Sequence, residues 1–232
     1  MTTIKENFLR VMERIERAAH RAGRDPKDIK LVAVSKTIEA SRVKEAIEAG
    51  ATILGENYVQ EAQKKIEEIG RPINRGISVA WHFIGHLQSN KAKNAVRLFD
   101  VIHSIDSLSL AQELNRRADQ ANRTLRVLVE VNLSGETSKF GADQESVLKM
   151  IRGILELKRL ALEGLMTMPP YFDLPEQSRP YYVRLRELKE RIVRDGMPVK
   201  GLSMGMSNDF EIAIEEGATY VRVGTAIFGS RK

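Results

Sequence analysis

The sequence predicts an α/β protein, a closed (β/α)8 TIM barrel with an extra N-terminal helix. Three observations predict this fold. Apolar strand-like runs alternate with amphipathic helical patterns, which favours parallel strands joined by right-handed crossovers. Eight such runs are present, the number that closes a barrel of this kind. The chain of 232 residues has a length at which these barrels form one domain, so residues 1–232 are predicted to be a single domain.

The elements can be justified in order along the chain. An amphipathic first helix has apolar residues at helical spacing, namely Ile4, Phe8, Val11, Met12, Ile15 and Ala19. Apolar runs then predict strands at 30–35, 52–54, 80–84, 100–104, 125–131, 160–166, 200–203 and 219–223. The patterns between them predict helices at 39–49, 57–69, 88–98, 107–122, 143–158, 176–195 and 208–216. Because 226–232 is too short for a full last helix, we expect the N-terminal helix to occupy that position.

Composition narrows the class of protein. The chain has no cysteine and no apolar run near the roughly 20 residues of a membrane span, so we expect a soluble, cytoplasmic protein. The 37 Lys+Arg and 31 Asp+Glu residues give a net charge of +6, but the two signs are interspersed along the helices. Without a basic, aromatic-rich patch, nucleic-acid binding is not expected. We expect a monomer.

Lys36 ends the apolar run 31–35 and is the first candidate functional residue. In a barrel of this kind the active site forms at the C-terminal ends of the strands. A lysine there can lose hydration, become nucleophilic near neutral pH and form a Schiff base. The alternative is a lysine that has left the core and is solvated.

Arg222 and two loops are expected to lie near Lys36, at the same end of the barrel. Strand alternation places Arg222 with Tyr220 on the inner face of the last strand, because Val221 and Val223 face the helices. The loops after strands seven and eight, 203–208 and 224–225, lie where such barrels bind phosphate. Ser207 is expected to be the N-cap of the helix that follows. An amine, a guanidinium and a phosphate site together suit pyridoxal 5′-phosphate.

Four motifs carry a resemblance to a known family. They are 34–37 (VSKT), 55–58 (GENY), 81–91 (WHFIGHLQSNK) and 203–207 (SMGMS). With them the chain resembles the YggS/PROSC family of pyridoxal phosphate homeostasis proteins, from about Leu31 to Gly229. The resemblance implies a PLP fold type III barrel, like the N-terminal domain of bacterial alanine racemase, with the cofactor as a Schiff base on Lys36. It further implies contacts to the ring from Asn57, to the ring nitrogen from Arg222, and to the phosphate from Ser207, Gly224 and Thr225, with Met206 in the same cofactor-binding set.

The function expected from this resemblance is PLP homeostasis: the protein holds PLP and delivers it, with apo forms of PLP-dependent enzymes as possible acceptors. No catalytic residue is assigned, and turnover is expected to be weak, because an arginine at the ring nitrogen weakens the electron sink. Two alternatives stay open. One is an amino-acid racemase of the alanine-racemase type, and the other is a cofactor-free Schiff-base aldolase, which leaves Arg222 without a clear role.

Other polar residues have open roles. His82 and His86 lie on a strand and the turn after it, without a third ligand nearby in the sequence, so no metal site is expected. We expect them to form hydrogen bonds in the core or at the barrel mouth. Glu130 and Asn132 share one strand face and either line the mouth or lie in solvent. Lys139, in the loop that follows, either meets a ligand or is solvated.

Overall fold

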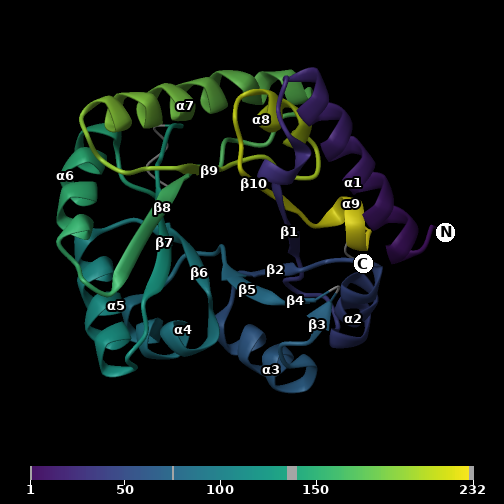
Figure 1. Cartoon of the computed structure of the whole chain (residues 1–232), viewed down its shortest axis with the longest axis horizontal. Helices are drawn as coiled ribbons and strands as arrows, with labels where there is room; N and C mark the ends of the chain where they lie inside the picture. Colours follow the sequence, from purple (N-terminus) through teal and green to yellow (C-terminus); the bar gives the residue numbers. More distant parts are fainter. Residues whose placement is uncertain (1, 75, 135–139, 230–232) are drawn as a thin grey trace.

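The computed structural model describes residues 2–74, 76–134 and 140–229. Eight parallel strands form a closed barrel with the spatial order β1-β10-β9-β8-β7-β6-β5-β2 (Figure 1). Their bounds are β1 Lys30–Val34, β2 Ile53–Glu56, β5 Ala80–Phe83, β6 Val101–Ile105, β7 Leu125–Glu130, β8 Leu160–Met166, β9 Gly201–Ser203 and β10 Tyr220–Val223. The (β/α)8 prediction is confirmed, and the ends of each expected strand differ from those observed by at most two residues.

Helices surround the barrel (Figure 1). The α-helices are α1 Ile4–Arg21, α2 Ala40–Ala49, α3 Val59–Ile69, α4 Ala92–Leu98, α5 Leu108–Gln120, α6 Gln144–Leu155, α7 Arg179–Arg194, α8 Phe210–Glu215 and α9 Thr225–Phe228. The described residues also form the short 3-10 helices η1 Pro26–Asp28, η2 Ser89–Lys91 and η3 Pro175–Ser178. No helix in the described ranges is long and apolar enough to cross a membrane.

The extra helix α1 occupies the position left by the short last helix, as expected. It begins with a capping box, in which Thr3 and Glu6 satisfy each other's backbone amides. It packs against α2, α8 and α9. Arg14 of α1 pairs with Glu211 of α8 at 2.6 Å, and the Asn7 amide donates to the carbonyl oxygen of Ile227 in α9. The N-terminal helix therefore closes the helical layer beside β1.

One element was not expected, and one expectation was wrong. A short antiparallel ribbon, β3 (Ile73–Asn74) and β4 (Ile77–Ser78), lies outside the barrel and was not predicted. Ser207 is not the N-cap of the following helix, because α8 begins only at Phe210, with Asp209 at the N-cap position. The Asp209 carboxylate accepts a hydrogen bond from the backbone amide of Met206 at 2.7 Å, which holds 206–209 in a turn before the helix.

Alternation along the strands separates two apolar layers. The interior of the barrel holds a small cluster of Val32, Val101, Leu128, Met166 and Tyr220, whereas the larger cluster lies between the barrel and its helices. Val221 and Val223 belong to the outer cluster, so Arg222 faces inward with Tyr220. Strand β10 pairs with β1, with Val32 opposite Arg222. The predicted orientation of Arg222 is confirmed.

Candidate functional site

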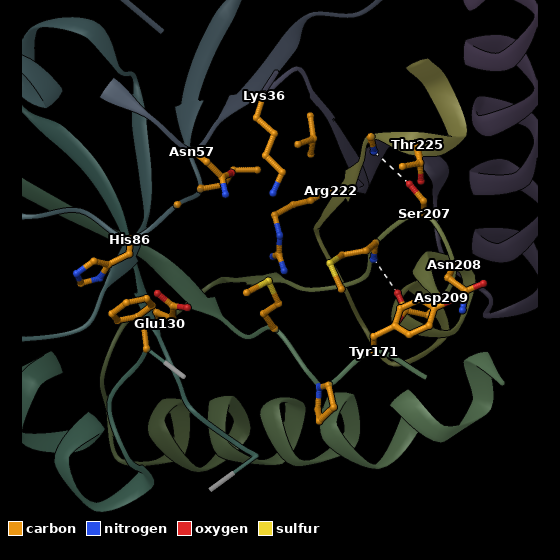
Figure 2. Close-up of a pocket in the computed structure, with 18 of the residues that line it drawn as sticks. Lys36, Asn57, His86, Glu130, Tyr171, Ser207, Asn208, Asp209, Arg222 and Thr225 are labelled. Carbon is orange, nitrogen blue, oxygen red and sulfur yellow. Dashed lines mark hydrogen bonds between the residues drawn. The ribbon is translucent and has the colours of Figure 1, made fainter. Parts of the chain in front are cut away.

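A cavity of about 510 Å³ opens at the C-terminal ends of the barrel strands (Figure 2). The seven residues expected to bind a cofactor all line it: Lys36, Asn57, Met206, Ser207, Arg222, Gly224 and Thr225. They come from segments that follow β1, β2, β9 and β10, and from β10 itself. The barrel topology therefore brings together residues that are up to 189 positions apart in the sequence, between Lys36 and Thr225.

Lys36 lies two residues after the end of β1, and its side chain points into the cavity (Figure 2). Val34 also lines the cavity, while Val32 lies deeper in the barrel interior, so the three residues share one face as the sequence predicted. Ser35, between Val34 and Lys36, is fully buried. A half-buried amine at the mouth of a buried strand has the setting that a lysine nucleophile needs.

Arg222 is 5% exposed, and two hydrogen bonds fix its guanidinium. Its Nη1 donates to the hydroxyl oxygen of Ser203 at 2.6 Å, and its Nη2 donates to the carbonyl oxygen of Thr167 at 2.9 Å. Burial lowers the pKa of Arg222, but a guanidinium stays protonated in proteins. The cavity therefore has a fixed positive charge at its base.

A chain of buried polar side chains continues inward from Arg222. The Ser203 hydroxyl lies 2.9 Å from His103 Nδ1, and His103 Nε2 lies 2.9 Å from His82 Nδ1. Because arginine only donates, Ser203 accepts from Arg222 and can donate its own proton to His103. Burial lowers the pKa of His82 to about 3 and that of His103 well below its usual range, so both imidazoles are neutral near pH 7.

His103 and Ser203 were not predicted as part of the site. A signal was present, since His103 shares the parity of Val101 on β6, and Ser203 follows the outward-facing Leu202 on β9. Alternation alone would have placed both side chains inside the barrel. His82 lies in the core as one of the two expected alternatives, and it is not part of a metal cluster: the described residues contain no group of three metal-ligating side chains.

The loops after β9 and β10 meet at one side of the cavity. The Ser207 hydroxyl accepts hydrogen bonds from the backbone amides of Gly224 at 3.2 Å and Ala226 at 3.3 Å (Figure 2 draws one of them). Gly205 has a φ of +90°, and a Cβ there would lie 2.6 Å from the Cβ of Ala213. Glycine therefore permits this loop to turn tightly against α8, where it presents Ser207 to the amides of the last strand's loop.

Asn57 lies opposite that loop and carries an unsatisfied atom. Its Oδ1 is buried and has no hydrogen-bond partner in the part of the chain that the structure describes. The backbone of Asn57 packs against Gly85, where a Cβ would lie 2.5 Å from the carbonyl oxygen of Asn57. This close approach explains why a glycine stands in the 81–91 motif. A residue that lines the cavity and holds a buried amide oxygen without a partner fits a polar ligand at that place.

The outer part of the cavity is aromatic and acidic. Glu130 lines it and is 7% exposed, whereas Asn132 is not among its lining residues. Burial raises the pKa of Glu130 to about 7; the charge of Arg222 lowers it in part, and Asp106 raises it further. His86 lies at the mouth, 3.2 Å from Asp106 and stacked on the ring of Phe140. Lys139 falls outside the described residues.

Architecture and cavity together define a (β/α)8 barrel protein with an amine, a fixed guanidinium and clustered hydrogen-bonding groups at its mouth. The family model described as alanine racemase, N-terminal domain, matches residues 7–232. The pyridoxal phosphate homeostasis protein of Aquifex aeolicus is 44% identical over 228 residues, which cover 98% of each chain. The chain therefore belongs to the pyridoxal phosphate homeostasis protein family, within the group that has the alanine racemase N-terminal domain.

Two solved structures complete the comparison. PipY of Synechococcus elongatus with PLP bound is 35% identical and superposes with a TM-score of 0.80, covering 93% of this chain and all of that chain. An alanine racemase of Clostridium difficile superposes with a TM-score of 0.74, covering 97% of this chain but 57% of the racemase. At 18% identity, the racemase shares the fold of this chain, and nothing about activity follows from it.

Proposed function

We propose that this chain binds pyridoxal 5′-phosphate and takes part in intracellular PLP homeostasis, holding the cofactor as a Schiff base on Lys36 and delivering it. The observation that carries this proposal is the position of Lys36, Arg222 and Ser207 on one cavity. Relatives named pyridoxal phosphate homeostasis protein and the PLP-bound PipY structure support it. In this proposal the chain is a cytoplasmic monomer, and its acceptors are apo forms of PLP-dependent enzymes.

The residues present fit such a cofactor. When bound, PLP supplies an aldehyde carbon that a lysine amine can attack. The half-buried Lys36 would provide that amine, and the guanidinium of Arg222 would donate to a ring nitrogen. Asn57, whose buried Oδ1 has no partner among the described residues, lines the same space. Ser207, Gly224 and Thr225 would receive the phosphate, with Met206 beside them, because backbone amides and hydroxyl groups suit a dianion.

We propose holding and delivery rather than turnover for a physical reason. A donor-only arginine at a ring nitrogen leaves that nitrogen unprotonated, so the ring stabilises negative charge poorly. Arg222 is held in place by Ser203 and Thr167, and it has no neutral form near pH 7 that could reverse this effect. The name of the Aquifex aeolicus relative agrees with a role in cofactor homeostasis.

The absorption spectrum of the purified protein mixed with PLP tests cofactor binding. A visible band should appear, and borohydride should bleach it and leave a pyridoxyl group on the peptide that contains Lys36. If the group is found on another peptide, the assignment of Lys36 is wrong. The highest PLP concentration in this test is the one at which free lysine in solution also forms a Schiff base. If the protein shows no band up to that concentration, the proposed function is wrong.

A panel of amino acids tests the proposal that the protein holds and delivers PLP rather than catalysing turnover. The loaded protein is incubated with L-alanine and other common amino acids, and the products are separated by chiral chromatography. We expect racemisation far below ordinary enzyme turnover, which is about 1 to 1000 per second. Turnover within that range for any of them would favour the racemase alternative.

A further inference from the structure

Lys65 is a buried lysine that the proposed site does not use. It lies on α3, is 7% exposed, and directs its ammonium group toward the segment that carries Lys36. The ammonium donates three hydrogen bonds: to the carbonyl oxygen of Ser35, to Glu56 Oε1 at 2.8 Å and to Glu61 Oε1 at 2.6 Å. A lysine ammonium has three protons, so all its donors are used.

These acceptors connect Lys65 to the two residues that flank Lys36 in the chain. Ser35 immediately precedes Lys36, and its carbonyl oxygen accepts from Lys65 while its hydroxyl donates to Glu56 Oε1 at 2.6 Å. Thr37 immediately follows Lys36, and its backbone amide donates to Glu61 Oε1 at 2.5 Å. One ammonium group is thus bonded directly to the residue before Lys36 and, through Glu61, to the residue after it. We call Ser35, Thr37, Glu56, Glu61 and Lys65 the Lys65 cluster.

The backbone of Thr37 needs such a restraint. Its φ is +62°, in the left-handed region that a β-branched residue rarely adopts. Backbone in such a conformation persists only where the surrounding contacts determine it. The amide of Thr37 is held by Glu61, and Glu61 is held in turn by Lys65. Thr37 itself is exposed, so packing of its side chain does not supply the restraint.

The buried charges argue for a role beyond stability. Glu56 is fully buried, and burial raises the pKa of its carboxyl group while the hydrogen bond and charge of Lys65 lower it. Apolar residues of similar volume often stabilise a protein as well as a buried ion pair does, so such a pair is weak support for a purely stabilising role. Here the pair contacts Ser35, on one side of the proposed nucleophile, and Lys65 also holds Glu61, which binds the backbone amide of Thr37 on the other side.

We propose that Lys65 is a positioning residue for Lys36: through Ser35, Glu56 and Glu61 it fixes the backbone on both sides of Lys36 and thereby the direction in which that side chain enters the cavity. This inference rests on the proposed function, because it takes Lys36 as the residue that reacts with PLP. Lys65 itself is not among the residues that line the cavity, so its effect passes through the backbone.

Three variants and one control test the role. Lys65→Met removes the ammonium, and Glu61→Ala removes only the bridge to the amide of Thr37. Glu61→Ala/Thr37→Gly adds a glycine that adopts a positive φ without strain. Lys44→Met is the control, because Lys44 of α2 forms an exposed pair with Glu68 of α3, the helix that also carries Lys65. Glu61 is only partly buried, so its variants keep the test valid if Lys65→Met does not fold.

The first measurement uses the cofactor-free protein. Amide hydrogen exchange of Thr37 should be about tenfold faster or more in Glu61→Ala than in wild type, because the amide loses its acceptor and the strained turn opens. Lys65→Met should also accelerate this exchange, and Lys44→Met should leave it unchanged. Unchanged exchange of Thr37 in both Lys65→Met and Glu61→Ala would overturn the proposal.

The second measurement separates positioning from general damage. The rate of covalent attachment of PLP to Lys36, trapped with borohydride, should fall by about tenfold to 100-fold in Lys65→Met and Glu61→Ala. Affinity for pyridoxine 5′-phosphate, which has an alcohol in place of the aldehyde, should stay nearly unchanged. Thr37→Gly should restore much of the attachment rate to Glu61→Ala, which a general loss of folding would not permit.

Two other outcomes would overturn the positioning role of Lys65. Equal losses of attachment rate and of pyridoxine 5′-phosphate affinity would show that Lys65 merely supports the fold, and would overturn the positioning role. Unchanged attachment in folded Lys65→Met would do the same. If wild type attaches no PLP to Lys36, the proposed function fails, whereas the exchange of Thr37 still decides whether Lys65 restrains the backbone.

Discussion

Arg222 donates a hydrogen bond from Nη1 to the hydroxyl oxygen of Ser203 at 2.6 Å, inside the barrel. Both residues are buried, and the second contact of Arg222, to the carbonyl oxygen of Thr167, fixes the plane of the guanidinium. A flat group with two fixed donors cannot be replaced by a point charge without loss of direction. The position of Arg222 relative to the cavity is therefore determined by β9 and by the residue that follows β8, as well as by its own strand.

We expect Arg222→Glu to weaken PLP retention far more than Arg222→Lys. Lysine keeps the positive charge and loses the planar fork, whereas a glutamate places a carboxylate beside Glu130 and the proposed phosphate site. Retention is measured by dialysis against cofactor-free buffer. Thermal unfolding of both variants serves as the control, because an unpaired buried charge destabilises a protein by about 3–5 kcal/mol. Equal retention in the two folded variants would mean that Arg222 does not face the ligand.

Lys36→Ala should abolish covalent attachment of PLP and leave the barrel folded. The side chain extends into the cavity and contributes chemistry more than packing, so the free energy of unfolding should change by about 0.5 kcal/mol or less. Circular dichroism and urea unfolding check the fold, and borohydride trapping with peptide mapping checks attachment. Some PLP should remain bound without a covalent bond, through Arg222 and the loop residues. A pyridoxyl group trapped on this variant would show that another lysine reacts.

Ser207→Asp and Thr225→Asp should lower affinity for PLP strongly and affinity for unphosphorylated pyridoxal little. Each new carboxylate would face a phosphate dianion in a partly desolvated site, where like charges repel by several kcal/mol at an effective dielectric constant of about 20. Isothermal titration with the two ligands measures the difference. Ser109→Asp, at an exposed serine on α5 outside the cavity lining, is the control. A parallel loss for both ligands would place the damage in the ring site or in the fold.

The alternation of residues along each strand predicted much of the fold, because this alternation depends only on the order of neighbouring residues in the sequence. The eight strands, the inward face of Arg222 and the common face of Val34 and Lys36 all follow from alternation within single strands. The closure of the barrel then follows from the number of strands, and the position of the cavity follows from strand direction. Helix α1 was placed correctly because the segment after β10 is short.

Contacts between distant residues could not be predicted in the same way. Ser207 matches the usual N-cap residue types, but its hydroxyl bonds to the amides of Gly224 and Ala226, from the neighbouring strand's loop. Lys65 reads as one of many polar residues on α3, and its burial depends on Glu56 and on Ser35 of other elements. Side-chain partners that lie 9 to 30 positions apart and belong to different elements leave no periodic signal in the sequence.

The final prediction concerns Glu130, whose carboxyl group lies in the cavity near Arg222 and Asp106. Burial raises its pKa from the ordinary 4.5 to about 7. Between these two values the folded protein holds a proton that the unfolded chain has lost, so the free energy of unfolding falls as pH rises through this range. A difference of about 2.5 pKa units corresponds to about 3 kcal/mol at most, and this stabilisation is absent above pH 7.

Glu130→Gln should remove that dependence. Relative to wild type, the variant should gain up to about 3 kcal/mol of stability between pH 4.5 and pH 8, measured by urea unfolding of the cofactor-free proteins. His82 and His103 oppose the trend, because their lowered pKa values make stability rise with pH, but both proteins contain them and the difference cancels their effect. Glu16→Gln, at an exposed position on α1, is the control: its free energy of unfolding should change with pH in the same way as that of wild type. A constant offset between Glu130→Gln and wild type across this range would show that Glu130 titrates like an exposed carboxyl.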